Sequence, residues 1–185
     1  MTTTQVLAAL AIAISSTAVA SAEDTVERKS LQVFNDIQRS VLSYPNFTVF
    51  DDVKVSLGEG GTVIVGGRVT MAYKKDDIAR RIARVEGVKD VRNEIAVLPA
   101  STFDDDLRHR VARAIYGHPS FWHYAAMANP PIHIVVDRGR VTLSGVVANN
   151  VERMLARSLA VTFGAFSVKN ELLTDGEAKQ ETEKL

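Results

Sequence analysis

The sequence contains no cysteine, and this absence removes several chemistries at once. Without thiols the chain has no disulfide, no thiolate metal site and no cysteine nucleophile. Aromatic residues make up only 6% of the chain, with a single tryptophan, so any local gathering of aromatic side chains is informative. Neither sign of charge is in excess, because 22 basic residues balance 22 acidic ones. A balanced chain has no global field that selects nucleic acid as its partner.

Long apolar runs are also missing after the first few residues. The apolar segment 6–14 has the length of a signal peptide and is too short to span a bilayer. Ala20 and Ala22 are the small residues that suit a cleavage site. We therefore expect a signal peptide over 1–22, cleaved after Ala22, then a polar linker over 23–29 and a periplasmic location. The segment before the apolar run lacks lysine and arginine, so an uncleaved anchor or a different start codon is the alternative.

The most informative feature that is present is a repeat. Each of two copies contains a strand pattern bounded by glycines, an alanine-flanked helical pattern and a further strand pattern. The segments are 61–69, 79–83 and 87–95 in copy one, and 139–147, 156–160 and 164–172 in copy two. We expect one domain over 30–99 and a second over 100–174. The polar tail over 175–185 has almost no apolar side chains to bury, so we expect it to fray.

Each copy begins with a predicted helix followed by a predicted hairpin. Apolar residues recur three or four positions apart over 31–41 and 107–115, which predicts the two helices. Alternating apolar residues then predict hairpins whose second strands are 62–69 and 140–147.

A second helix and a last strand complete each copy. The expected buried stripes of these helices are Ile78, Ile82 and Val85 in copy one, and Val151, Leu155 and Leu159 in copy two. Gly87 and Gly164 end the helices, as glycines after a C-terminus often do. The prediction is an α+β fold of two tandem α-β-β-α-β units. In each unit two helices cover one face of a three-stranded mixed sheet, and a right-handed crossover makes the last strand parallel.

These residues resemble the BON domain family (bacterial OsmY and nodulation). The family pattern runs Gly-x-Val-x-Leu-x-Gly-x-Val, then an alanine-flanked helix, then Gly-Val-x-x-Val-x-Asn. Copy one matches at Gly61, Val63, Val65, Gly67, Val69, Ala79, Gly87, Val88, Val91 and Asn93. Copy two matches at Gly139, Val141, Leu143, Gly145, Val147, Ala156, Gly164, Val168 and Asn170, and departs at Ala165.

The resemblance implies a tandem-BON protein similar to the osmotically inducible periplasmic proteins of that family. Such proteins are associated with phospholipid binding, envelope integrity and chaperone-like holding of other proteins. Lipid contact in the family is associated with the first helix of the second domain, which corresponds to 107–116 here. The motif residues themselves are expected to be structural, because glycines serve turns and close packing. The asparagines are expected to bond backbone groups at the strand edge.

Copy two differs from copy one by about four extra residues, which fall within 121–131. This segment holds the only tryptophan, two further aromatic residues and a methionine. In addition, the stretch 107–136 contains no aspartate or glutamate. The same stretch carries three arginines, Arg108, Arg110 and Arg113, and all four histidines, His109, His118, His123 and His133. Cations attract anionic headgroups, and tryptophan and tyrosine favour the headgroup boundary.

We therefore predict that an anionic phospholipid or a partner protein contacts Arg108, Arg110, Arg113, Trp122, His123 and Tyr124. Two other interpretations stay open at this point. The arginines also fit a solvated helix face near Asp104–Asp106, and Trp122 and Tyr124 also fit a plug between the two copies. Phe121 aligns with Phe47 and is expected in the core. The histidines are not spaced like a metal site, so no metal is expected.

The sequence contains no recognisable set of catalytic residues. The sequence contains neither a nucleophile elbow nor a loop that would cradle phosphate, so we expect no enzyme and no cofactor. The predicted function is a non-enzymatic, exported envelope protein that binds anionic phospholipid through copy two and supports envelope integrity or stress tolerance. The alternative is a periplasmic chaperone or adaptor that holds envelope proteins through the same aromatic surface.

Overall fold

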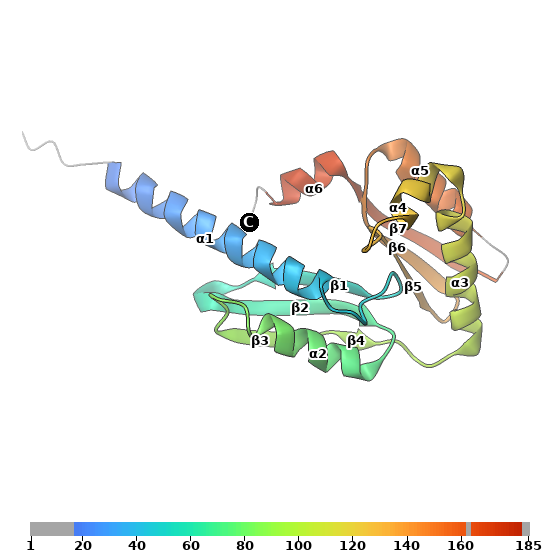
Figure 1. Ribbon diagram of the computed structural model, residues 1–185, viewed down its shortest axis with the longest axis horizontal. Helices are drawn as coiled ribbons and strands as arrows, with labels where there is room; N and C mark the ends of the chain where they lie inside the picture. Colours follow the sequence, from blue (N-terminus) through green and yellow to red (C-terminus); the bar gives the residue numbers. More distant parts are fainter. Residues whose placement is uncertain (1–16, 162–163, 183–185) are drawn as a thin grey trace, which may run out of the picture.

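The computed structural model describes residues 17–161 and 164–182, and it consists of two similar lobes (Figure 1). Copy one contains α1 (Thr17–Leu42), β1 (Asp52–Leu57), the short helix η1 (Glu59–Gly61), β2 (Thr62–Val69), α2 (Ala72–Ile82), β3 (Asp90–Asn93) and β4 (Ala96–Val97). Copy two contains α3 (Thr102–Tyr116), η2 (Pro119–Phe121), α4 (Trp122–Ala125), β5 (Ile132–Asp137), β6 (Arg140–Val147), α5 (Asn150–Ala160), β7 (Ser167–Thr174) and α6 (Asp175–Thr182). Within the described ranges, no helix combines the length and apolarity that a bilayer span requires.

Both sheets have the predicted topology, which confirms the fold class. In copy one β1 pairs antiparallel with β2, and β3 and β4 both pair parallel with β2. In copy two β5 pairs antiparallel with β6, and β7 pairs parallel with β6. The predicted last strand of copy one is thus broken into β3 and β4, whereas that of copy two is continuous.

Each sheet buries one face under its own helices. The core of copy one includes Ile37 of α1, Ile78 and Ile82 of α2, and Val63 and Val65 of β2. The core of copy two includes the three apolar residues of α3 at helical spacing, Leu107, Val111 and Ile115. Phe121 is fully buried there, as expected.

Motif glycines allow a close approach of the backbone at equivalent places in the two copies. Gly67 has φ 115° and Gly145 has φ 106°, which is conformational space that side chains disfavour. A Cβ on Gly67 would lie 2.1 Å from the Asp52 carbonyl oxygen, and one on Gly145 would lie 1.9 Å from that of Pro131. These glycines are therefore structural.

The motif asparagines fasten the last strand to the second helix. Asn93 Nδ2 donates to the Lys75 carbonyl at 3.0 Å, and Asn170 Nδ2 donates to the Arg153 carbonyl at 2.9 Å. Each Oδ1 also accepts a backbone N–H two residues later in the chain. The matching contacts make Lys75 and Arg153 structurally equivalent, and this sets the alignment of α2 with α5.

Three local predictions are wrong. The predicted linker 23–29 is part of α1, since its glutamates, arginine and lysine are good helix formers. The predicted frayed tail contains α6, which begins with a capping box in which the Thr174 N–H donates to Glu177 at 2.8 Å. Val151 is 75% exposed, because α5 buries Ala156 and Ala160 instead. Most of the predicted signal peptide, residues 1–16, lies outside the described residues.

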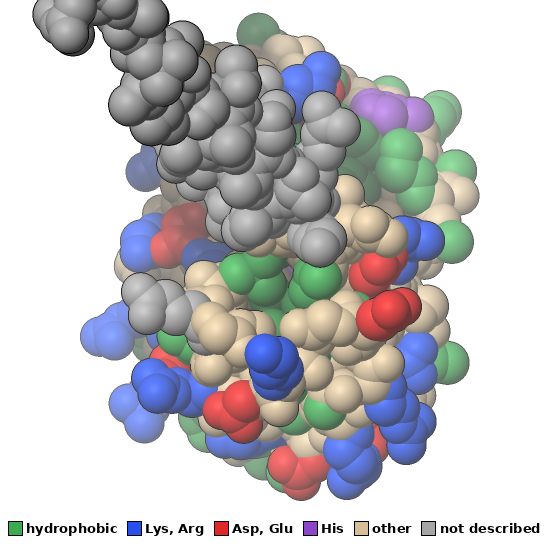
Figure 2. Space-filling model, turned by 90° about the vertical axis from the view of Figure 1, so that its left-hand side faces the viewer, with side chains coloured by type: hydrophobic (Ala, Val, Ile, Leu, Met, Phe, Trp, Pro, Cys, Tyr) green, Lys and Arg blue, Asp and Glu red, His purple; other side chains and the backbone are tan. Residues whose placement is uncertain are grey.

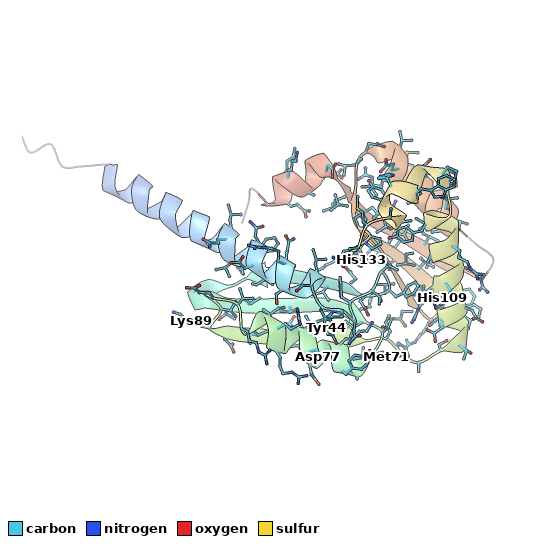
Figure 3. The ribbon with its side chains drawn as sticks, viewed as in Figure 1. Tyr44, Met71, Asp77, Lys89, His109 and His133 are labelled. Carbon is cyan, nitrogen blue, oxygen red and sulfur yellow. The ribbon has the colours of Figure 1, made fainter. Side chains whose placement is uncertain are left out.

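The two lobes meet where the chain enters β1. The Ile134 N–H of β5 donates to the Val49 carbonyl at 2.6 Å. Phe47 packs against His133 with ring centroids 5.3 Å apart, and Phe50 packs against His109 at 4.9 Å. Figure 3 shows both labelled histidines on copy two, with His133 close to the boundary between the lobes. Two of the four histidines therefore serve contact between the copies.

Candidate functional site

The three arginines of α3 lie in different environments. Arg108 is only 5% exposed, and its guanidinium lies 2.7 Å from Asp105 and 3.4 Å from the Val136 carbonyl. The prediction that Arg108 contacts a surface is therefore wrong, because helical spacing puts it next to the core residues Leu107 and Val111. Arg110 is half-buried, whereas Arg113 is exposed on the outer side of the helix. Arg113 makes no ion pair within the described part of the chain.

The extra residues of copy two form one helical turn, α4, directly after η2. Trp122 is 61% exposed, and its indole N–H donates to the Gly117 carbonyl at 3.2 Å. That bond fixes the ring against the C-terminal end of α3 without covering it. His123 is exposed as well, and its ring centroid lies 3.8 Å from that of Tyr124. Trp122 is thus not a plug between the copies.

Tyr124 has a structural role instead of a surface one, which corrects its predicted contact. It is 7% exposed, and its hydroxyl donates to Glu152 at 2.7 Å and accepts the Ala148 N–H at 2.9 Å. Burial and the bond to Glu152 raise the pKa of Tyr124 to about 12. The hydroxyl therefore stays protonated and ties α4 to the first turn of α5.

Three further large apolar side chains of copy two are exposed on or near α4 and α5. Met127 follows α4, while Val151 and Met154 lie on the solvent side of α5, at 75% and 64% exposure. Helix α5 lies beside α3, and its first turn is tied to α4, so the three helices form one layer (Figure 1) from which these exposed side chains project into solvent. We name this set, with two neighbouring cations, the outer face: Arg113, Trp122, Met127, Val151, Met154 and Arg157.

A second apolar group lies at the opposite end of the same helix layer. Phe103 at the start of α3 stacks on Phe166 with centroids 6.1 Å apart, and Val161 follows α5. Phe103, Val161 and Phe166 are 45%, 64% and 77% exposed. Large exposed apolar side chains are unremarkable one by one, but a group of them marks a contact surface.

The buried aspartate of copy two explains the acidic cluster at the start of α3. Asp104 is 1% exposed and accepts the backbone N–H groups of Arg138 and Gly139, both at 2.8 Å. It therefore holds the β5–β6 turn, where Arg138 has a positive φ of 51°. Ser101 caps the helix by accepting the Asp104 N–H. The described residues contain no cluster of three or more side chains that could hold a metal ion.

The model of the BON domain family matches residues 35–99 and 104–175, which is most of the chain and both copies. The chain belongs to the BON domain family. The family is known for membrane or phospholipid association and for envelope stress roles, and its domain is a non-catalytic binding domain. The tandem BON prediction is thereby confirmed.

Other comparisons add little to this assignment. No curated protein matches the chain. One similar solved structure is CdsD, a structural protein of the type III secretion system of Chlamydia trachomatis. It is 15% identical with a TM-score of 0.29, and the match covers 82% of this chain and 97% of that one. A separate structure of the CdsD C-terminal domain is 13% identical with a TM-score of 0.28. The match covers 76% of this chain and 96% of that one.

Proposed function

We propose that this BON protein is exported and binds anionic phospholipid surfaces through the outer face of copy two. The observation that carries the proposal is the exposed indole of Trp122, together with exposed Met127, Val151 and Met154 on the same layer of helices. Apolar side chains of this kind enter the boundary between headgroups and acyl chains. The indole adds a ring that favours this boundary because it is apolar with one polar edge.

The cations of the outer face supply the preference for anionic lipid. Arg113 and Arg157 are exposed, and neither makes an ion pair among the residues that the structure describes. Each cation near a negatively charged membrane contributes about 1 kcal/mol, and salt screens the attraction. The buried Arg108 does not take part, because Asp105 already compensates its charge. The protein is a binding module in this proposal, with no catalytic step.

Vesicle flotation with paired variants tests the proposal. Met154→Asp puts a carboxylate on the outer face, and we expect it to weaken binding to anionic vesicles at least about tenfold, because an aspartate must be desolvated and repels the lipid. The matched control is Tyr73→Asp, at the equivalent of Val151 on α2 of copy one, where Tyr73 is 51% exposed. Equal loss from both variants, or none from Met154→Asp, would contradict the assignment to copy two.

A further inference from the structure

A groove of about 760 Å³ lies between the two copies, away from the outer face. Its apolar walls come from Phe34 and Leu42 of α1, Val53 and Val55 of β1, Val146 of β6 and Leu173 of β7. Figure 2 shows a small group of hydrophobic side chains near the middle of the face that it presents. The volume is in the range of sites that bind a ligand or a short chain segment.

One wall of this groove is an unpaired strand edge. β1 is the edge strand of its sheet and pairs only with β2. The Val65 carbonyl of β2 accepts the Glu94 N–H at 2.7 Å, on the side of β2 that faces away from β1. Val55, which lies opposite Val65, therefore directs its own N–H and C=O away from β2. The same alternation applies to Val53, so within the described part of the chain the backbone N–H and C=O groups of both residues are not hydrogen-bonded.

The uncompensated charge of the groove is negative. Lys54 and Lys169 share Glu171 of copy two, at 2.8 and 2.6 Å, and Arg153 is paired with Glu177 at 2.9 Å. Asp52 and Glu181 also line the groove, and neither makes an ion pair in the described part of the chain. A ligand with an anionic headgroup is therefore disfavoured here, and a ligand with a cationic end is favoured.

We propose that the groove binds an extended polypeptide segment, which adds to β1 as a further strand. Backbone pairing with Val53 and Val55 supplies the affinity, and alternate apolar side chains fill the space between α1 and the sheet of copy two. Lysine or arginine at one end of the segment meets Asp52 and Glu181. An acyl chain fits the groove less well, because it leaves the strand-edge backbone groups without partners. This site is independent of the outer face.

Amide hydrogen exchange on the whole chain tests the proposal directly. The probe is a peptide of about ten residues that alternates valine and threonine and ends in two lysines. We expect the peptide to protect the amides of Val53 and Val55, which exchange readily in the free protein. The amides of Lys54 and Ser56, which bond to β2, should be protected with or without it. Peptide binding without protection of Val53 and Val55, or no binding, would overturn the proposal.

Two matched pairs separate strand pairing from general stickiness. A peptide with N-methyl groups along its pairing edge should bind at least about tenfold more weakly, because each lost hydrogen bond reduces affinity several-fold. Val55→Pro removes one edge N–H and should weaken binding about as much, whereas Ser56→Ala should not. If Val55→Pro fails to fold, the two peptides still decide the question on the unaltered protein. Equal binding of both peptides, or sodium myristate displacing the peptide, would contradict strand addition.

Discussion

The segment that leads into the second helix is held by different side chains in the two copies. In copy one, buried Asp51 accepts the Thr70 N–H at 2.9 Å and the Lys74 ammonium at 2.7 Å. Burial alone would raise the pKa of Asp51, but hydrogen bonds from Lys74, Thr70 and Thr48 outweigh it and lower the pKa. Copy one thus relies on a buried ion pair.

Copy two uses a neutral hydroxyl at the same place. Tyr124 accepts the Ala148 N–H and donates to Glu152, which occupies the position of Lys74. A carboxylate stands where copy one has an ammonium, and the tyrosine comes from the extra turn α4 instead of the loop before β1. The extra turn therefore has two sides: Tyr124 anchors it, and Trp122 is left exposed.

The solvent-exposed sides of α2 and α5 also differ, with a polar side chain in copy one where copy two has an apolar one. The asparagine contacts make Asp76 of α2 equivalent to Met154 of α5, and Ala83 equivalent to Val161. Copy one exposes a carboxylate where copy two exposes a thioether. The two copies share the asparagine contacts but differ in the side chains exposed on their second helices. We therefore expect the membrane-binding surface on copy two.

The largest expected effect comes from breaking the ion pair of copy one. Lys74→Ala leaves Asp51 buried without its cation, and we expect a loss of about 3–5 kcal/mol in the free energy of unfolding. Glu152→Gln at the equivalent position keeps the bond to Tyr124 and should cost about 1 kcal/mol. Chemical denaturation measures both. A control that removes both charges, Asp51→Asn with Lys74→Met, should restore much of the lost free energy of unfolding. A similar loss of stability in Lys74→Ala and Glu152→Gln would contradict the difference between the two copies.

Contact between the copies should respond to pH through His133. Burial lowers the pKa of His133, with Asp52 and Asp51 acting in the opposite direction. The unfolded chain therefore binds the proton more readily, so stability falls as pH drops below about 6.5 and levels off below the folded pKa. Thermal unfolding across this range should show a smaller decline in His133→Phe than in the unaltered protein. His123→Phe, at an exposed site, is the control, and an unchanged decline in His133→Phe would exclude this role.

The fold was readable from the sequence because its signals are local. Alternating valines, motif glycines and the repeated asparagine each indicate a backbone arrangement, and their repetition fixed the order of strands and helices. Of the predicted α5 stripe, Leu155 and Leu159 pack against the core, but Val151 is exposed, because small Ala156 and Ala160 lie on the packed side. Helix α5 lies so close to its sheet there that alanines fill the space.

The candidate site was harder to predict because exposure depends on tertiary partners. Trp122 and Tyr124 are two residues apart in one aromatic segment, yet only Tyr124 finds Glu152 and Ala148 from distant parts of the chain. Arg108 likewise looks like a surface cation until Asp105 and the Val136 carbonyl are placed around it. The predicted strand order already puts β1 at an edge, but the groove beside it depends on how the two copies pack, which the sequence does not show.

The most direct measurement is the emission of Trp122 with anionic and with uncharged vesicles. As the only tryptophan, it reports on the outer face alone. We predict a blue shift with anionic vesicles, which weakens with added salt and is lost in Met154→Asp but kept in Tyr73→Asp. Emission that stays unchanged with anionic vesicles, or shifts equally with uncharged ones, would contradict a charge-selective membrane surface on copy two.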